Sequence, residues 1–298
     1  MSTFPKVIPA LFPPLFGAFA LALLLQALGV PLIGWVMFLV WGAAVVAYGA
    51  RVAATPGVLK RDLDTLPGRT GLTAANLTLM LVAAFLAHRS SVVGMVLLAI
   101  ALLLQVALIL AFLSRIRADK ALRAVQPVWQ MIFTGFVVAI PAAALVGALP
   151  LAQALLGFSV ATAVLIWALS ALQLVAKRYP PAQLRPALAI HLSPAAMIGQ
   201  GAVLCGYPLL ADAFFWVSAA IFVALVVNIR WITVHGFSPF WSAFTFPLVG
   251  FAGLAFAVHP WTGWGLTALA TGVVLYVCAR VFTLWRSGRL AELTFAAV

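Results

Sequence analysis

Five acidic side chains and four histidines are the groups in this sequence whose types could support acid–base or metal chemistry. The acids all fall in predicted loops, at the edge of an apolar stretch or in the C-terminal tail: Asp62, Asp64, Asp119, Asp212 and Glu292. Membrane prenyltransferases need clustered aspartates, and intramembrane proteases need paired aspartates, a serine dyad or zinc ligands. Because no such set lies within an apolar stretch, we predict no enzymatic activity, no metal site and no cofactor. Asp62 and Asp64 stand beside Lys60 and Arg61, which indicates a charge-balanced loop.

The histidines are scattered and show no metal-binding spacing: His88, His191, His235 and His259. His191, in the segment AIHLSP, is the only titratable side chain near the middle of an apolar stretch. Two interpretations stay open for it. It senses pH or contacts a substrate, or it is a hydrogen-bonded structural histidine. Cys205 and Cys278 lie among apolar residues and are predicted to pack there.

The stretch FWSAFTFP at 240–247 has a different kind of chemistry, that of bulky aromatic rings beside a helix break. Pro247 stands inside an apolar segment that continues to Val258. A proline in a helix interior removes a backbone hydrogen bond and kinks the helix. The sequence therefore predicts three phenylalanines and a tryptophan clustered against a kink.

The composition identifies the elements that must position these residues as membrane helices. Of 298 residues, 66% are hydrophobic and 7% are charged, whereas a soluble domain carries about 25% charged residues. The N-terminal segment has one lysine and no small-residue cleavage site, so we interpret it as a retained helix. We expect a polytopic, all-α integral membrane protein with a single transmembrane domain over 1–298.

Ten stretches are long and apolar enough to cross a bilayer, which takes about 20 residues each. We predict spans at 9–29, 31–52, 71–88, 91–113, 127–147, 150–176, 186–206, 212–231, 238–258 and 261–284. Connections from odd to even spans are short, and those from even to odd spans are longer and polar. This layout predicts five helical hairpins.

The basic residues fix an orientation for these hairpins. Sixteen of the seventeen fall on the side that holds both predicted termini: Lys6, Arg51, Lys60, Arg61, Arg69, Arg115, Arg117, Lys120, Arg123, Lys177, Arg178, Arg185, Arg230, Arg280, Arg286 and Arg289. Only Arg89 falls on the other side. By the positive-inside rule, that side and both termini are predicted to be cytoplasmic. The net charge of +12 is thereby explained by topology, and no nucleic-acid partner is expected.

Internal prolines separate the odd spans from the even ones. Pro13 and Pro14, Pro141, Pro194 and Pro247 lie within the first, fifth, seventh and ninth spans. Broken backbone at membrane depth is tolerated where it is buried or lines a water-filled cavity. We therefore predict an inner pore ring of odd spans and an outer ring of even spans. The third span has no internal proline and contributes Asn76 as a polar feature.

Charge is missing from the middle of every predicted span. Ion-coupled carriers usually keep ionisable residues within the membrane. A neutral pore with a basic mouth holds cations poorly and attracts anions, and broken helices expose N–H groups that can meet them. The pattern favours inorganic or small organic anions as substrates.

Four segments combine prolines, glycines and aromatic residues: FPPLFGAFALAL at 12–23, VQPVWQMIFTGFVVAIPAAALVG at 125–147, LRPALAIHLSPAAMIGQGA at 184–202 and FWSAFTFPL at 240–248. Together these segments resemble the tellurite-resistance/dicarboxylate transporter family, which includes bacterial tellurite-resistance proteins, fungal malate permeases and the slow anion channels of plant guard cells. They occur in the family's order, and the ten-helix layout covers the whole chain.

The resemblance implies a homotrimer in a bacterial inner membrane, with one pore in each subunit. It also implies that a ninth-helix phenylalanine, here Phe246, plugs the pore, which would explain the aromatic cluster beside Pro247. The candidate pore-lining residues are Pro13, Phe16, Asn76, Thr134, Pro141, His191, Pro194, Thr245 and Pro247.

Three functions are compatible with the sequence to different degrees. The first is an anion channel occluded by Phe246. The second is a carrier for C4-dicarboxylates such as malate, or a tellurite-resistance exporter, with saturable and pH-dependent flux. The third, a membrane enzyme or scaffold, lacks a catalytic constellation. Flux that stays linear with concentration separates a channel from a carrier.

Overall fold

The computed structural model describes residues 6–119 and 123–296. Over these residues the chain is helical, with no strand. The prediction of an all-α integral membrane protein is confirmed. Nine described helices are long and apolar enough to cross a membrane: Pro9–Ala27, Ile33–Ala54, Leu66–Ala87, Ser91–Ala118, Leu149–Val175, Ala182–Leu204, Pro208–Val227, Pro239–Val258 and Pro260–Arg286.

The remaining predicted span, 127–147, differs from the expected continuous helix. It consists of α6 (Val128–Phe133), the 3₁₀ helix η3 (Gly135–Ala139) and α7 (Ile140–Leu145). Pro141 lies in the first turn of α7, where its missing N–H costs no helical hydrogen bond. The count of ten spans stays a prediction.

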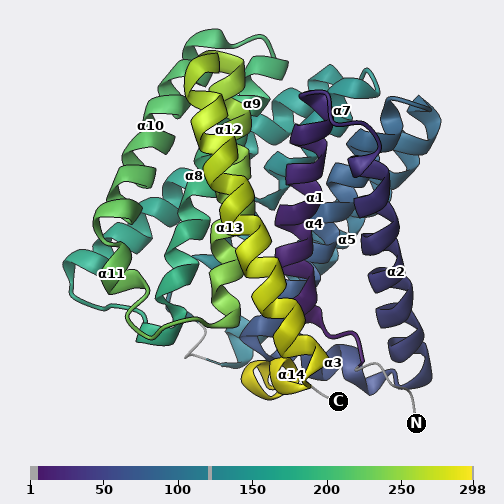
Figure 1. Cartoon of the computed structure of the whole chain (residues 1–298), viewed down its shortest axis with the longest axis vertical. Coiled ribbons are helices and arrows are strands. Elements are labelled where there is room, and N and C mark those ends of the chain that lie inside the picture. Colours follow the sequence, from purple (N-terminus) through teal and green to yellow (C-terminus); the bar gives the residue numbers. More distant parts are fainter. Residues whose placement is uncertain (1–5, 120–122, 297–298) are drawn as a thin grey trace.

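Five long helices form the exposed outer layer (Figure 1): α2 (Ile33–Ala54), α5 (Ser91–Ala118), α8 (Leu149–Val175), α10 (Pro208–Val227) and α13 (Pro260–Arg286). Only 17–28% of the residues in their most apolar windows are buried. Helices that present apolar side chains around their outer surface are suited to lipid.

The other helices are largely buried: α1 (Phe12–Ala27) with η1 (Pro9–Leu11), α4 (Leu66–Ala87), α9 (Leu192–Leu204) with η4 (Ala182–His191), and α12 (Thr245–Val258) with η5 (Pro239–Phe244). Between 50% and 72% of the residues in their apolar windows are buried. Their contacts close a cycle that runs from α1 to α4, to η3 and α7, to α9, to α12 and back to α1. The inner layer therefore forms a ring.

The inner helices change type where prolines occur. η1 begins with Pro9, and Pro13 lies in the first turn of α1. Pro194 and Pro247 are each the third residue of an α-helix that follows a 3₁₀ helix. A proline near a helix start is tolerated, whereas deeper in the helix it would break the ladder. α4 has no such break, in keeping with the absence of an internal proline.

A buried glutamine bridges the broken fifth span to its neighbours. Gln105 of α5 donates from Nε2 to the carbonyl oxygens of Met131 and Ile132, at 3.1 and 2.7 Å. Its Oε1 accepts from Asn76 Nδ2 at 2.9 Å. Carbonyls at the end of a short helix have no partner within it, so this side chain stabilises the break.

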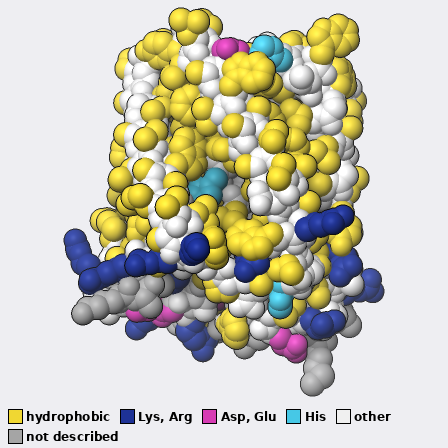
Figure 2. Space-filling model, turned by 90° about the vertical axis from the view of Figure 1, so that its left-hand side faces the viewer, with side chains coloured by type: hydrophobic (Ala, Val, Ile, Leu, Met, Phe, Trp, Pro, Cys, Tyr) yellow, Lys and Arg dark blue, Asp and Glu magenta, His cyan; other side chains and the backbone are white. Residues whose placement is uncertain are grey.

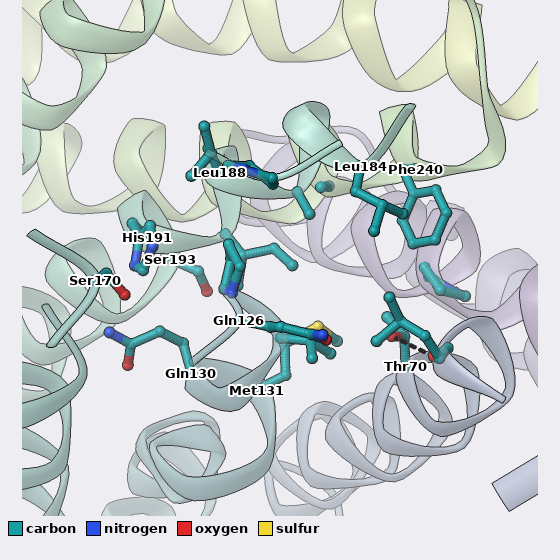
Figure 3. A pocket seen from close by; sticks show the side chains of 18 of the residues that line it. Thr70, Gln126, Gln130, Met131, Ser170, Leu184, Leu188, His191, Ser193 and Phe240 are labelled. Carbon is teal, nitrogen blue, oxygen red and sulfur yellow. Dashed lines mark hydrogen bonds between the residues drawn. The ribbon is translucent and has the colours of Figure 1, made fainter. Parts of the chain in front are cut away.

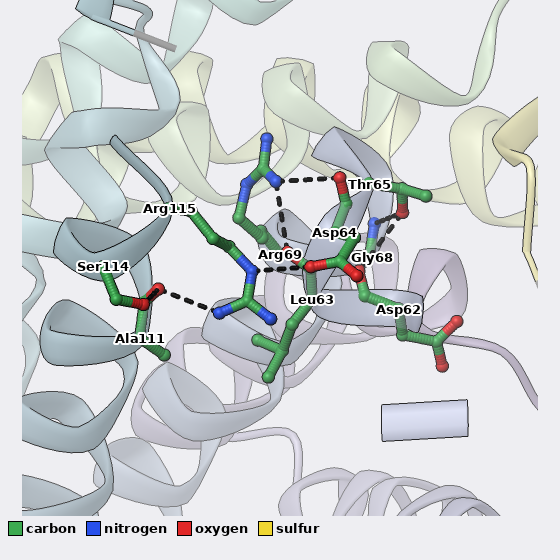
Figure 4. A network of polar contacts seen from close by, with 9 residues as sticks. All are labelled: Asp62, Leu63, Asp64, Thr65, Gly68, Arg69, Ala111, Ser114 and Arg115. Atoms are coloured by element: carbon green, nitrogen blue, oxygen red, sulfur yellow. Dashed lines mark hydrogen bonds and ion pairs between the residues drawn. The ribbon is translucent and has the colours of Figure 1, made fainter. Parts of the chain in front are cut away.

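The connection expected as a loop after the second span contains a helix, α3 (Gly57–Asp64). Two arginines hold the end of α3 (Figure 4). Arg115 Nε donates to the carboxylate of Asp64 at 2.9 Å, and Arg69 Nη1 donates to the backbone oxygens of Leu63 and Asp64. Tyr48 donates to Asp62 Oδ2 at 2.8 Å. These contacts fix α3 across the ends of α2, α4 and α5.

One end of the molecule carries the basic side chains. Figure 2 shows Lys and Arg gathered at the lower end of an otherwise apolar surface. α14 (Arg289–Thr294) and η1 contact each other at this end (Figure 1). We call it the basic end. The first and last described elements therefore lie on one side of the apolar belt.

Candidate functional site

A cavity of about 630 Å³ runs into the molecule from the basic end. Its walls come from all five members of the inner ring, with additional residues from α8. Along α1 and η1 the lining extends from Ala10 to Phe16, and along η5 and α12 from Pro239 to Pro247. The cavity therefore follows the basic-end half of the ring and ends near the helix breaks.

Two stacked phenylalanines stand at its deep end. The rings of Phe16 on α1 and Phe246 on α12 lie 3.8 Å apart between centroids, with an interplanar angle of 18°. Both side chains are buried and both line the cavity. The two rings come from neighbouring members of the inner ring, α1 and α12, so their stack forms part of the wall at this end of the cavity.

The close approach of α1 to α12 makes this stack possible. Gly17 follows Phe16 and faces Thr245 and Phe246, where a Cβ atom on residue 17 would lie 2.9 Å from the backbone nitrogen of Phe246. Only glycine allows backbones to come this near. Thr245 donates from Oγ1 to the carbonyl of Ser242 at 2.7 Å, which fixes the turn from η5 into α12 one residue before Phe246.

Seven of the predicted site residues line the cavity: Pro13, Phe16, Thr134, His191, Pro194, Phe246 and Pro247. The structure thus brings together residues from four separate spans. A role for any of them in conduction stays a prediction.

Asn76, Pro141 and Thr245 do not line this cavity. Asn76 turns toward α5 and donates to the carbonyl of Ala101 at 3.0 Å as well as to Gln105. Pro141 lies deeper along its span than Val138, the last lining residue there. Thr245 packs toward α1 through its contact with Gly17.

Several polar lining residues were missed by the sequence analysis. They include Gln126, Gln130, Ser170 and Ser193 (Figure 3). Ser170 lies on α8, an outer helix, where no pore-lining residue was expected. Polar side chains inside apolar spans were the available signal for Gln130 and Ser170.

The electrostatic character of the cavity is neutral to positive. Arg123 and Arg178 are the charged side chains among the described lining residues, and no Asp or Glu is among them. Both arginines are exposed at the basic end. An anion entering from this end meets positive charge first and then polar and apolar walls.

The arrangement offers no metal-binding group. Within 6–119 and 123–296, no three His, Cys, Asp or Glu side chains come together as a metal site. What the cavity wall offers is polar side chains from several elements together with apolar and aromatic surface.

The chain matches a known protein family over nearly its whole length. A family model described as SLAC1, voltage-dependent anion channel, matches residues 6–287. A search of curated proteins finds no match to this chain.

Proposed function

The chain belongs to the SLAC1 family of voltage-dependent anion channels, and from this premise we propose that it conducts small anions through the cavity, with Phe246 and Phe16 as the occluding pair. The observation that carries the proposal is the ring stack at the end of a cavity whose described lining has no acidic side chain. Bulky apolar rings in a narrow path exclude water and block ions.

The conducting path in this proposal is the inside of the inner ring. It enters between Arg123 and Arg178, passes the polar residues of the cavity and continues past the Phe16–Phe246 stack. The helix breaks next to the path leave backbone groups that partly replace the water around an anion. The five outer helices then separate this path from lipid.

We further propose that the protein lies in a bacterial inner membrane with both termini in the cytoplasm. The basic end supports this orientation through the positive-inside rule. Alkaline phosphatase fused to the C-terminus should be inactive in cells, whereas a fluorescent protein fused there should fluoresce. The reverse pair of results would contradict the orientation.

A homotrimer is proposed from the family resemblance and from the exposed apolar outer helices. Native mass spectrometry of the purified protein should find three copies. A monomeric mass under conditions that keep the protein folded would rule this out.

A carrier for C4-dicarboxylates, or a tellurite exporter, is the second candidate. The feature that favours it is the size of the cavity, about 630 Å³, which exceeds what a single halide occupies. The two arginines at the basic end could each pair with an anionic group of a larger substrate.

Flux into liposomes decides between the two candidates. We expect chloride and nitrate flux to increase linearly with concentration well beyond the range in which a carrier saturates, and malate flux to stay low. Saturable malate uptake without anion conductance would favour the carrier instead. Liposomes that contain Phe246→Ala serve as the open control in both assays.

A further inference from the structure

The strongest unexplained feature is a group of buried polar atoms on one wall of the cavity. Neither ring nitrogen of His191 has a hydrogen-bond partner among the described residues, and neither does Ser170 Oγ. Buried polar groups nearly always have partners, because leaving one unpaired costs about 1–3 kcal/mol. A ligand that enters the cavity can supply the hydrogen-bond partners that these side chains lack within the described protein.

These atoms belong to a cluster built from four elements. Figure 3 shows Ser170 of α8, His191 of η4, Ser193 of α9 and Gln130 of α6 in the same part of the cavity. Residues from four separate segments meet here, so the cluster is a product of the fold and not of one helix end.

The backbone around His191 is held firmly. The carbonyl oxygen of His191 accepts a hydrogen bond from Trp167 Nε1 at 3.3 Å. His191 is also the N-cap residue of α9, so its carbonyl lies at the start of the helical hydrogen-bond ladder. The backbone of this residue is thus held by its neighbours, whereas its imidazole has no partner among the described residues.

The cluster is a set of hydrogen-bond donors. Gln130 Oε1 already accepts from Thr134 Oγ1 at 2.8 Å, and its Nε2 has one long contact, 3.4 Å, to the carbonyl of Ala163. One amide N–H of Gln130 is left over, the two serine hydroxyls can each donate, and a neutral imidazole donates from one nitrogen. With no carboxylate among the described lining residues, such a set suits an anion.

We propose that His191, Ser170, Ser193 and Gln130 form a binding site for one weakly hydrated monovalent anion, of the halide or nitrate type, on the basic-end side of the Phe16–Phe246 stack. This inference rests on the proposed anion conduction and adds a defined binding site along the conducting path. The donors are uncharged, and the cost of removing an ion from water rises steeply with its charge. A dianion such as sulfate or a dicarboxylate is therefore disfavoured here.

The direct test is bromide bound to the full-length protein. Anomalous diffraction from crystals grown in sodium bromide should show a peak within hydrogen-bonding distance of His191 and Ser170. The peak should vanish in His191→Leu, which keeps the bulk of the side chain, and should persist in Ser218→Ala. Ser218 is a matched control, because its buried hydroxyl donates to the carbonyl of Phe214 outside the cavity. Water or empty density at the cluster in bromide would overturn the site.

A second measurement uses transport in the Phe246→Ala background, where the constriction is open. We expect Ser170→Ala and His191→Leu each to raise the half-saturating nitrate concentration about tenfold, since each removes a donor to a charged group. An unchanged half-saturating concentration, or displacement of bromide by sulfate at lower concentration than by nitrate, would refute the proposal. If Phe246→Ala passes no anion, the proposed channel function fails, and the bromide experiment still decides the site by itself.

Discussion

Replacing Phe246 by alanine is expected to raise anion conductance about tenfold or more. The ring is proposed to form the energy barrier to ion passage, and lowering such a barrier by about 1.4 kcal/mol increases the rate tenfold. The ring of Phe246 stacks on Phe16 at 3.8 Å between centroids. Without it, Phe16 loses the ring on which it stacks, and water can enter the space that the ring of Phe246 fills. Single-channel recording in planar bilayers measures the change.

The matched control lies on the same helix. Phe251 of α12 is also buried, but it packs against Phe215 and Phe222 and does not line the cavity. Phe251→Ala should lower thermal stability and leave the conductance of the folded protein unchanged. Equal conductance in wild type and Phe246→Ala, with both proteins folded, would show that Phe246 is one more packing residue.

The second large effect is expected at Gly17. A methyl group there would overlap the side chain of Thr245 and the backbone of Phe246, so α1 and α12 would have to separate. Overpacking of this kind costs about 1–3 kcal/mol. We expect Gly17→Ala to lower the midpoint of thermal unfolding in detergent.

Gly42→Ala provides the comparison for Gly17→Ala. Gly42 lies on α2, and a Cβ atom at this position meets nothing within 4 Å. Alanine is the better helix former by about 0.5–1 kcal/mol, so Gly42→Ala should unfold at the same temperature as wild type or above it. If both variants unfold like wild type, the close contact between α1 and α12 is not what holds the two rings together.

The membrane architecture could be predicted from the sequence because it depends on patterns that one chain displays directly. The length of the apolar stretches predicts the membrane spans. The uneven distribution of Lys and Arg among the connections predicts which end of the molecule is basic. Pro194 and Pro247 were expected to break the seventh and ninth spans, since proline disrupts a helix interior. The structure adds that a new α-helix begins two residues before each of them. Phe246 was proposed as the plug from the family resemblance alone, and the structure shows that its ring stacks on Phe16.

The composition of the cavity wall was less predictable, because it depends on which way individual side chains turn. Asn76 is polar and lies on an inner helix, yet its Nδ2 donates to Gln105 and Ala101 of α5 and does not face the cavity. Ser170 is polar and lies on an outer helix, yet it reaches the cavity. No periodicity distinguishes these two cases, since both are decided by how neighbouring helices pack.

The broken fifth span illustrates the same limit. Its length and hydropathy are those of a single membrane helix, but Gly135 and Pro141 bracket a 3₁₀ segment. What makes the break tolerable is Gln105, 26 and 27 residues before Met131 and Ile132, because its amide donates to the carbonyls of both. A partner on another helix cannot be read from the local sequence.

The most direct test of anion conduction is the reversal potential of Phe246→Ala beside wild type in planar bilayers under a potassium chloride gradient. Anion passage predicts currents in the variant that reverse near the equilibrium potential of chloride, with smaller currents of the same selectivity in wild type. Reversal near the equilibrium potential of potassium, or no current from either folded protein, would contradict a path for anions through this cavity.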